Sequence, residues 1–560
     1  MGQTPESHNL DELVNVAAHL PRMAARQPHL RAVVFPAGHD KSGRVAYSHY
    51  TYKQLNETCD KIAHGLESVG ITRGTRTILM VKPSLEFFAL TFAIFKVGAI
   101  PVMIDPGMGV KRMLHCLKAT EATGFVGIPL AHVLRKFSPG SFRSIKSVVT
   151  VGKRLFWGGA TLADFLAQPW KPYEMAPTAP EETAAILFTT GSTGPAKGVV
   201  YSHSIFNAQV QYMKSEFGFS PGDVDLPTFP LFALFAPALG MTAIIPDMDP
   251  TKPAQVDPVK IVEAIQNQGV TTMFGSPALL NRVGRYVVEH DLKFPSLRRI
   301  ITAGAPVGPD NLERFRTALN DDAEIYTPYG ATESLPVAKM ESKEILQDTR
   351  YQTEKGLGIC VGRPVENMEL RIIGISDEPI AHWDDELEVD TGVVGEICVR
   401  GPVVTREYYR LPEATAGAKI VDGDTFWHRM GDVGYYDEQG RVWFYGRKKH
   451  RVKTVEGTMF PVPCEAIFNQ HPDVYRSALV GVGEFGTQHP VICIELEEES
   501  KNKDLDQIRK ELLEMAALHD HTRAVETLLF HPSFPVDIRH NAKIFREKLT
   551  IWATELLEKQ

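Results

Sequence analysis

Helical and strand-like apolar segments alternate through most of this sequence, and this alternation constrains the fold more than any other feature. The helical segments are residues 87–96 and 258–266, and the strand-like ones are residues 100–104, 184–188, 271–274 and 297–302. Strands that alternate with helices form layered α/β structures with largely parallel sheets. With 560 residues the chain exceeds a single compact core. We therefore expect an α/β protein with a large N-terminal domain of this kind.

The pattern changes near Gly362, where short strands and turns replace the alternation. Residues 370–373, 395–399, 434–436 and 442–445 are strand-like. They predict a β-rich subdomain over residues 362–446, within an N-terminal domain of residues 1–446. A basic run from Arg447 to Arg451 follows, and the rest of the chain contains its own helices and strands. We place a boundary at this run, so that residues 447–560 form a small C-terminal α+β domain.

Composition narrows the class of protein. The formal net charge is −8, which argues against a sequence-independent nucleic-acid binder, because such proteins need a basic face. The first residues contain no basic region followed by an apolar stretch, so we expect no secretory signal. No two cysteines form a CxxC pair, and we expect reduced, mostly buried thiols in a cytoplasmic protein. The cysteines are Cys59, Cys116, Cys360, Cys398, Cys464 and Cys493.

Residues 226–246 carry no charge and are long enough to span a bilayer. Four prolines interrupt them, and each proline removes a backbone donor and breaks helical hydrogen bonding. Aspartates bracket the segment closely on both sides. We therefore expect a buried segment that lines an apolar pocket, and not a transmembrane helix.

The strongest local signal is a loop rich in glycine and hydroxyl side chains, directly after the apolar strand at residues 186–188. Glycines let backbone N–H groups approach a phosphate closely, hydroxyls add donors, and Lys197 supplies a positive charge. The loop is not a Walker A sequence, because Ala196 precedes the lysine and Gly198 follows it. An ordinary flexible turn is the alternative interpretation. The predicted phosphate-binding residues are Thr189, Thr190, Gly191, Ser192, Thr193, Gly194 and Lys197.

At this loop the chain resembles the superfamily of acyl-CoA synthetases, peptide-synthetase adenylation domains and luciferases. Further segments resemble that superfamily's motifs, in the same order, across nearly the whole chain. They are Thr51-Tyr52-Lys53-Gln54-Leu55, residues 96–101, Asp105-Pro106, Ala303-Gly304-Ala305-Pro306, Tyr329-Gly330-Ala331-Thr332-Glu333, residues 395–402, Gly431-Asp432 and Gly446-Arg447. The resemblance implies an enzyme that uses ATP and Mg²⁺ to activate a carboxylate as its acyl-AMP, with release of pyrophosphate.

The resemblance also implies roles for single residues. Tyr329 would stack on adenine, Thr332 would bond the α-phosphate, and Glu333 would hold Mg²⁺. Asp432 would accept from the ribose hydroxyls and Arg447 would approach the ribose. Each also has a structural alternative, as a core aromatic, a solvated carboxylate or a surface cation. Gly304, Ala305, Pro306 and Gly330 would form the adenine side of the site.

A second lysine lies near the C-terminus, in a segment that resembles the superfamily's closing Gly-Lys-x-x-Arg element, with Ala542 in the glycine position. The resemblance implies that Lys543 bridges the substrate carboxylate and the α-phosphate. Charge builds there as pyrophosphate leaves, so a fixed ammonium stabilises the transition state most. The resemblance further implies that residues 447–560 are a mobile lid that carries this lysine, with Lys449 at the hinge; a solvated basic linker is the alternative.

Two departures concern the use of CoA. Gly457 stands one residue later than the glycine that lines the pantetheine tunnel of typical CoA ligases, and Ala233 replaces the usual histidine of the Pro-Phe-His element. A narrower resemblance fits them: residues 231–241, 246–250, 329–336 and 534–543 look like the olefin β-lactone synthetases of bacterial long-chain olefin biosynthesis. That family adenylates a 2-alkyl-3-hydroxyalkanoic acid and closes a β-lactone with release of AMP.

The chemistry of that family needs an apolar pocket for two alkyl chains. The predicted wall contains Phe232, Ala233, Phe235 and Met241. Attack by the tethered 3-hydroxyl needs no CoA and gains from a high effective concentration. His203 is a candidate base for this hydroxyl, and a structural histidine is the alternative. Association with other enzymes of the olefin pathway stays open.

Two other functions compete with this one. A long- or medium-chain acyl-CoA ligase would share the adenylation step and use a thiol acceptor. A non-catalytic nucleotide-binding scaffold is the third hypothesis, and the joint presence of Lys197, Glu333, Asp432 and Lys543 speaks against it.

Overall fold

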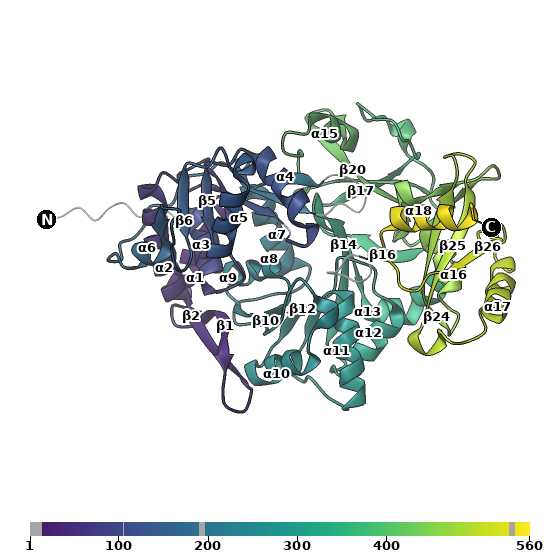
Figure 1. Ribbon diagram of the computed structural model, residues 1–560, viewed down its shortest axis with the longest axis horizontal. Helices are drawn as coiled ribbons and strands as arrows, with labels where there is room; N and C mark the ends of the chain where they lie inside the picture. The colour runs from purple at the N-terminus through teal and green to yellow at the C-terminus, as the bar shows by residue number, and fades with distance from the viewer. Residues whose placement is uncertain (1–13, 105, 190–195, 537–543, 560) are drawn as a thin grey trace.

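The computed structural model describes residues 14–104, 106–189, 196–536 and 544–559. Its described part contains two large β-sheets and two small ones, with helices packed against them (Figure 1). The expectation of an α/β protein is confirmed. The longer helices are α1 (His19–Arg26), α2 (Tyr52–Ser68), α3 (Leu85–Lys96), α4 (Val110–Thr120), α5 (Pro129–Phe137), α7 (His203–Ser215), α10 (Pro258–Gln268), α11 (Pro277–Glu289), α12 (Pro309–Arg316), α16 (Pro461–Phe468), α17 (Leu505–Ala517) and α18 (Arg546–Leu557).

The first large sheet has strand order β7-β6-β5-β3-β4-β8-β9. All neighbours in it are parallel except β8 and β9, which form an antiparallel hairpin. The apolar runs predicted at residues 100–104 and 184–188 are β4 and β8, which pair with each other in the interior of this sheet. The strands are β3 (Arg76–Met80), β4 (Ile100–Ile104), β5 (Gly124–Gly127), β6 (Ser147–Thr150), β7 (Ala160–Thr161), β8 (Thr183–Thr189) and β9 (Lys197–Ser202).

The second large sheet is mixed. The run β1-β11-β10-β12-β13-β14 is parallel, and the strands beyond β14 pair in antiparallel fashion. The strands are β1 (Arg31–His39), β2 (Val45–Thr51), β10 (Val224–Pro227), β11 (Thr242–Ile244), β12 (Thr272–Phe274), β13 (Arg299–Ile301), β14 (Glu324–Ala331), β15 (Ser334–Glu341), β16 (Ile359–Pro364), β17 (Glu369–Ile373), β18 (Gly395–Arg400), β19 (Lys419–Asp422), β20 (Thr425–Tyr436) and β21 (Val442–Arg447).

Strand β16 runs across Gly362 and pairs with β15 on one side and β21 on the other. The β-rich region is therefore continuous with the second sheet. Beyond Arg447 a separate sheet follows, made of β24 (Val474–Val482), β25 (His489–Leu496) and β26 (Thr527–Phe530), together with the small pair β22 (Val452–Lys453) and β23 (Thr458–Met459). Figure 1 shows this part at the end of the molecule opposite α1 and α2.

The early family-like segments have structural roles. Thr51 and Gln54 form a capping box at the start of α2, in which each side chain accepts from the other residue's backbone N–H. The adjacent Tyr52 is fully buried and donates a hydrogen bond of 2.7 Å to the carbonyl of Met241. At the end of α3, the ammonium of Lys96 lies 2.6 Å from the carboxylate of Asp60, and both are buried. These residues fix the packing that positions the site.

The long uncharged segment folds into short elements and is not a single helix. It contains the end of β10, α8 (Pro230–Ala233), α9 (Phe235–Leu239) and β11. No helix among the described residues is both long and apolar enough to cross a membrane. The six cysteines are buried and make no disulfide.

Candidate active site

The predicted phosphate loop connects β8 to β9, and the two strands hold its ends together. Thr189 pairs with Lys197, and Phe188 with Gly198. Gly198 needs to be glycine, because a Cβ there would lie 2.7 Å from the Phe188 ring. Thr190, Gly191, Ser192, Thr193 and Gly194 lie outside the described residues, as does Lys543.

Lys197 and Glu333 are linked through a tyrosine. The ammonium of Lys197 lies 4.4 Å from the centre of the Tyr408 ring, and the hydroxyl of Tyr408 donates a hydrogen bond of 2.8 Å to Oε1 of Glu333. Burial, with the charge of Glu333 as a further cause, raises the pKa of Tyr408. Tyr408 therefore stays protonated and keeps donating. The structure brings together two residues that are 136 positions apart in the sequence.

Thr332 and Glu333 form the turn between β14 and β15, and two neighbouring segments hold this turn. The hydroxyl of Tyr201 on β9 donates to the carbonyl of Thr332 at 2.6 Å. The backbone N–H and the hydroxyl of Thr405 donate to the carbonyl of Glu333 at 2.9 and 3.1 Å. The turn is thus tied to the β8–β9 hairpin that holds the predicted phosphate loop.

A partly buried lysine also contacts Thr405. The ammonium of Lys419, on β19, donates to the carbonyl of Thr405. Burial lowers the pKa of Lys419 to about 7, and the negative charge of Glu333 opposes that shift. Sequence reasoning missed Tyr201, Thr405, Tyr408 and Lys419. Thr405 and Tyr408 lie shortly after the matched segment 395–402, but no local pattern there indicates a contact with Glu333.

Tyr329, Asp432 and Arg447 form a second cluster. The hydroxyl of Tyr329 donates to Oδ2 of Asp432 at 2.7 Å, and Nη1 of Arg447 lies 3.0 Å from Oδ1. Asp432 and Arg447 are cross-strand neighbours on β20 and β21, which explains their contact. Burial raises the pKa of Asp432, the Arg447 charge opposes this, and Asp432 in turn raises the pKa of Arg447.

The residues predicted for the adenine side lie at the carboxyl ends of adjacent parallel strands. Gly304, Ala305 and Pro306 follow β13, and Tyr329 and Gly330 are at the end of β14. Gly304 has a positive φ of 98°, which favours glycine. A Cβ on Gly330 would lie 2.5 Å from the carbonyl oxygen of Ser334. In open α/β sheets, ligands bind at this edge, outside the carboxyl ends of the strands.

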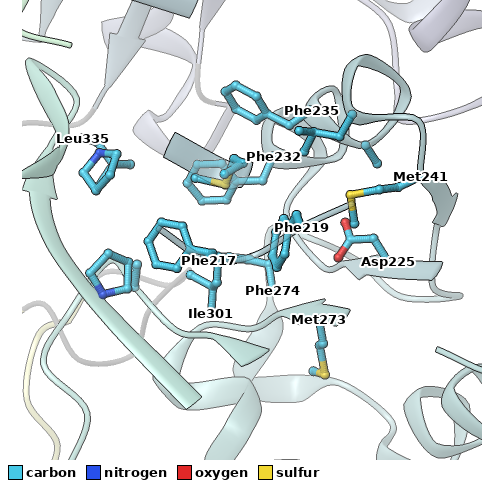
Figure 2. A pocket seen from close by; sticks show the side chains of 16 residues that line it. Phe217, Phe219, Asp225, Phe232, Phe235, Met241, Met273, Phe274, Ile301 and Leu335 are labelled. Carbon is cyan, nitrogen blue, oxygen red and sulfur yellow. The ribbon is translucent and has the colours of Figure 1, made fainter. Parts of the chain in front are cut away.

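An apolar cavity adjoins these loops (Figure 2). Phe232, Phe235 and Met241 line it, as predicted, whereas Ala233 is fully buried and is not a lining residue. Sequence reasoning missed the residues that α7, β12 and the β14–β15 hairpin contribute. The lining residues are Met213, Phe217, Phe219, Asp225, Phe232, Phe235, Ala236, Leu239, Met241, Met273, Phe274, Ile301, Ala303, Pro328, Leu335 and Pro336.

His203 has a structural position. It is the first residue of α7, and its Nδ1 accepts a hydrogen bond of 3.2 Å from the backbone N–H of Val16. Burial lowers the pKa of His203 to about 4. It does not line the apolar cavity. His203 is therefore better described as a structural histidine than as a base for the 3-hydroxyl.

Lys449 lies in a short turn between two anchored neighbours. The ammonium of Lys448 donates to the buried carboxylate of Glu396 at 3.0 Å. On the other side, Lys449 Nζ and His450 Nε2 lie 4.0 and 3.7 Å from Oε1 of Glu547 on α18. The turn therefore connects the β-rich region to the C-terminal part, which is the position expected of a hinge.

The sequence was compared with known proteins. Residues 20–409 match the profile of the family described as AMP-binding enzyme. Olefin β-lactone synthetases from Stenotrophomonas maltophilia and Xanthomonas campestris are 49% and 46% identical to this chain, each over 98% of this chain and 99% of the relative. The chain belongs to the AMP-binding enzymes, and within them to the olefin β-lactone synthetases.

Solved structures of this family share the fold. An amide bond synthetase from Marinactinospora thermotolerans superposes with a TM-score of 0.77 at 23% identity, over 96% of this chain and 99% of that one. An anthranilate CoA ligase in complex with anthranoyl-AMP gives 0.80 at 18% identity, over 99% and 100%. At such identities the likeness concerns the fold: a large N-terminal part with sheets and a smaller C-terminal part.

Proposed function

We propose that this protein activates a 2-alkyl-3-hydroxyalkanoic acid with ATP and closes it to a β-lactone, releasing pyrophosphate and AMP. The observation that carries the proposal is the 49% identity to an olefin β-lactone synthetase over nearly the full length of both chains. The site supports it, because acidic, basic and apolar groups meet at one edge of the second sheet.

The Asp432 cluster fits a nucleotide. Oδ1 of Asp432 is buried and accepts no hydrogen bond within the described residues, although Arg447 lies nearby. A buried acceptor without a donor is costly unless a ligand supplies one. Ribose hydroxyls are such donors. We infer that Asp432 holds the ribose, that Arg447 approaches it, and that Tyr329 together with Gly304, Ala305, Pro306 and Gly330 encloses the adenine.

Glu333 fits a site for Mg²⁺. Magnesium is commonly bound by one or two carboxylates together with substrate phosphates and water, so a single well-placed carboxylate suffices. The Tyr408 hydroxyl occupies one position on Oε1 and orients the group. When bound, Mg²⁺ would neutralise charge on the phosphate oxygens. Lys197, Thr332 and the loop residues Thr189 to Gly194 would also bind the phosphates.

The reaction has two steps in this proposal. In the first, a substrate carboxylate oxygen attacks the α-phosphorus, and the bond to the β-phosphate breaks. Lys543 would hold the attacking carboxylate against the α-phosphate, where negative charge develops. In the second, the 3-hydroxyl loses its proton, its oxygen attacks the acyl carbon, and the bond to AMP breaks. The tether between the hydroxyl and the acyl carbon makes this closure intramolecular.

We also propose that residues 1–446 and 447–560 are separate domains, and that the second is a lid that turns about Lys449. The support is that β21 ends at Arg447 and that a separate sheet follows it.

A strained lactone is prone to hydrolysis, which favours its direct transfer to another enzyme of the olefin pathway. We infer a cytoplasmic location from the six unpaired, buried thiols.

A product assay tests the function. The protein receives a 2-alkyl-3-hydroxy fatty acid and Mg-ATP, with and without CoA, and the products are identified by NMR and mass spectrometry. We expect AMP and a product one water lighter than the acid, independent of CoA. A thioester that forms only with CoA would instead identify an acyl-CoA ligase.

A further inference from the structure

Asp225 is the one titratable residue among the sixteen described residues that line the apolar cavity. Figure 2 shows its carboxylate beside Met241, on the side of the cavity away from Leu335. It is 7% exposed, and the hydroxyl of Thr272 donates to Oδ1 at 2.9 Å. No other hydrogen bond to this carboxylate is formed within the described residues. Oδ2 thus remains available on the cavity side.

The sheet register gives the depth of Asp225. It pairs with Thr272, which pairs with Arg299, which pairs with Glu324 on β14. Pro328, another lining residue, is on β14, three strands away from β10 and four residues further along. At about 3.3 Å per strand residue, the two positions are offset by about 13 Å along the strands, and the steps of about 4.8 Å between neighbouring strands add to this separation. The 3-hydroxyl is three bonds from the acyl carbon, so Asp225 is too deep to be its base. It would meet the far end of an alkyl chain.

A carboxyl group at the end of an apolar cavity is a poor neighbour for a hydrocarbon. An alkyl chain that reaches Asp225 excludes water from the carboxyl group. The carboxyl group is then buried without a full set of hydrogen-bond partners, which is energetically costly. We propose that Asp225 limits the length of the alkyl chain that this cavity accepts. The inference rests on the proposed function, because it assumes that an alkyl chain of the substrate occupies the cavity.

The electrostatic surroundings favour this role. The pKa of Asp225 is raised to about 7, chiefly by burial; the Thr272 hydrogen bond opposes the rise and the neighbouring carboxylate of Asp223 adds to it. Arg299, the cation on the neighbouring strands, is engaged with Asp223 at 3.2 Å. Near neutral pH the carboxyl is therefore partly protonated, and it becomes charged as pH rises. A charged group is the more costly one to cover with hydrocarbon, so discrimination should increase with pH.

The test is a series of 2-alkyl-3-hydroxy acids that lengthen two carbons at a time, assayed by exchange of labelled pyrophosphate into ATP. Wild type should show a drop in kcat/KM beyond a threshold length. Asp225→Leu should raise kcat/KM for acids beyond that threshold about tenfold or more relative to short acids, through KM. Asp321→Leu, the same exchange at an exposed position outside the cavity, is the matched control and should keep the wild-type profile.

Asp225→Asn provides a second readout in case the leucine variant folds poorly. In wild type the penalty on long acids should grow between pH 6 and 8, whereas in Asp225→Asn it should not depend on pH. Identical length profiles and pH dependence in wild type and both Asp225 variants would overturn the inference, as would an equal shift in Asp321→Leu. Pyrophosphate exchange reports adenylation alone, so the outcome is independent of whether a lactone or a thioester forms afterwards.

Discussion

The hydroxyl of Tyr408 donates a hydrogen bond of 2.8 Å to Oε1 of Glu333, while its ring lies 4.4 Å from the ammonium of Lys197. One side chain thus contacts both a basic group on β9 and an acidic group in the turn between β14 and β15. Both groups are proposed to act on the phosphates, so the position of Tyr408 determines how well they can act together.

Tyr408→Phe separates these two contacts, because the ring stays and the hydroxyl is lost. We expect kcat/KM for adenylation to fall about 10- to 100-fold, the effect of removing a hydrogen bond to a charged group. Saturation with Mg²⁺ should also need a higher concentration, because the Glu333 carboxylate is no longer oriented. Pyrophosphate exchange at several Mg²⁺ concentrations measures both effects.

The matched control is Tyr409→Phe, whose hydroxyl donates to the carbonyl of Thr120 and contacts neither Glu333 nor Lys197. It should retain the wild-type Mg²⁺ dependence. Equal behaviour of the two variants would show that the Tyr408 hydroxyl has no role in adenylation.

Asp432→Asn tests the proposed ribose contact. The substitution keeps the size of the side chain but removes the charge that Arg447 and the Tyr329 hydroxyl face. We expect KM for ATP to rise at least tenfold, with a smaller change in KM for the acid. Glu369→Gln, in a surface ion pair with Arg400, is the control and should change neither constant. An unchanged KM for ATP in Asp432→Asn would exclude the ribose assignment.

Dense local motifs made part of the site predictable from the sequence. Tyr329, Thr332 and Glu333 belong to one short segment, so a single β-hairpin turn places them together. Tyr408 and Lys419 could not be found in this way. Tyr408 reaches Glu333 because the backbone near it bridges to β9 at Val199, a long-range contact that no local pattern encodes.

The apolar strands at residues 100–104 and 184–188 were predictable for a similar reason: central parallel strands are buried on both faces and appear as continuous apolar runs. Asp225 was not predictable as a cavity residue, because in the sequence it is only a charged residue next to an uncharged segment. The depth of that residue depends on the pairing of β10 with β12, which the sequence alone does not specify.

Asp225 should also make stability depend on pH. The pKa of Asp225 is raised from 3.8 to about 7 by burial, so the folded protein binds more protons than the unfolded chain between these values. Unfolding therefore becomes easier as pH rises from about 4 to 7, and the loss is complete above 7. Between pH 5 and 8 we expect wild type to lose about 2–3 kcal/mol relative to Asp225→Asn.

Thermal melting of wild type and Asp225→Asn at pH 5 and pH 8 measures this difference. The melting temperature of wild type should fall by a few °C relative to the variant, since larger domains shift by roughly 2–4 °C per kcal/mol. Met273→Leu, an exchange of one apolar cavity residue for another, should show the same pH dependence of the melting temperature as wild type. A constant offset between wild type and Asp225→Asn at both pH values would mean that Asp225 is ionised throughout.

Lys543→Ala tests the assignment that comes from the closing motif alone. If Lys543 holds the carboxylate against the α-phosphate, its removal should abolish pyrophosphate exchange, while ATP still binds through Asp432 and the phosphate loop. Calorimetric titration with ATP separates binding from chemistry. Lys548→Ala, on α18 beside the Phe545 ring, is the control and should keep both. Exchange at near wild-type rate in Lys543→Ala would show that another cation has the catalytic role. Lys419 would be the next residue to replace, because it lies beside Thr405 and its pKa responds to the charge of Glu333. The sequence alone did not reveal this position.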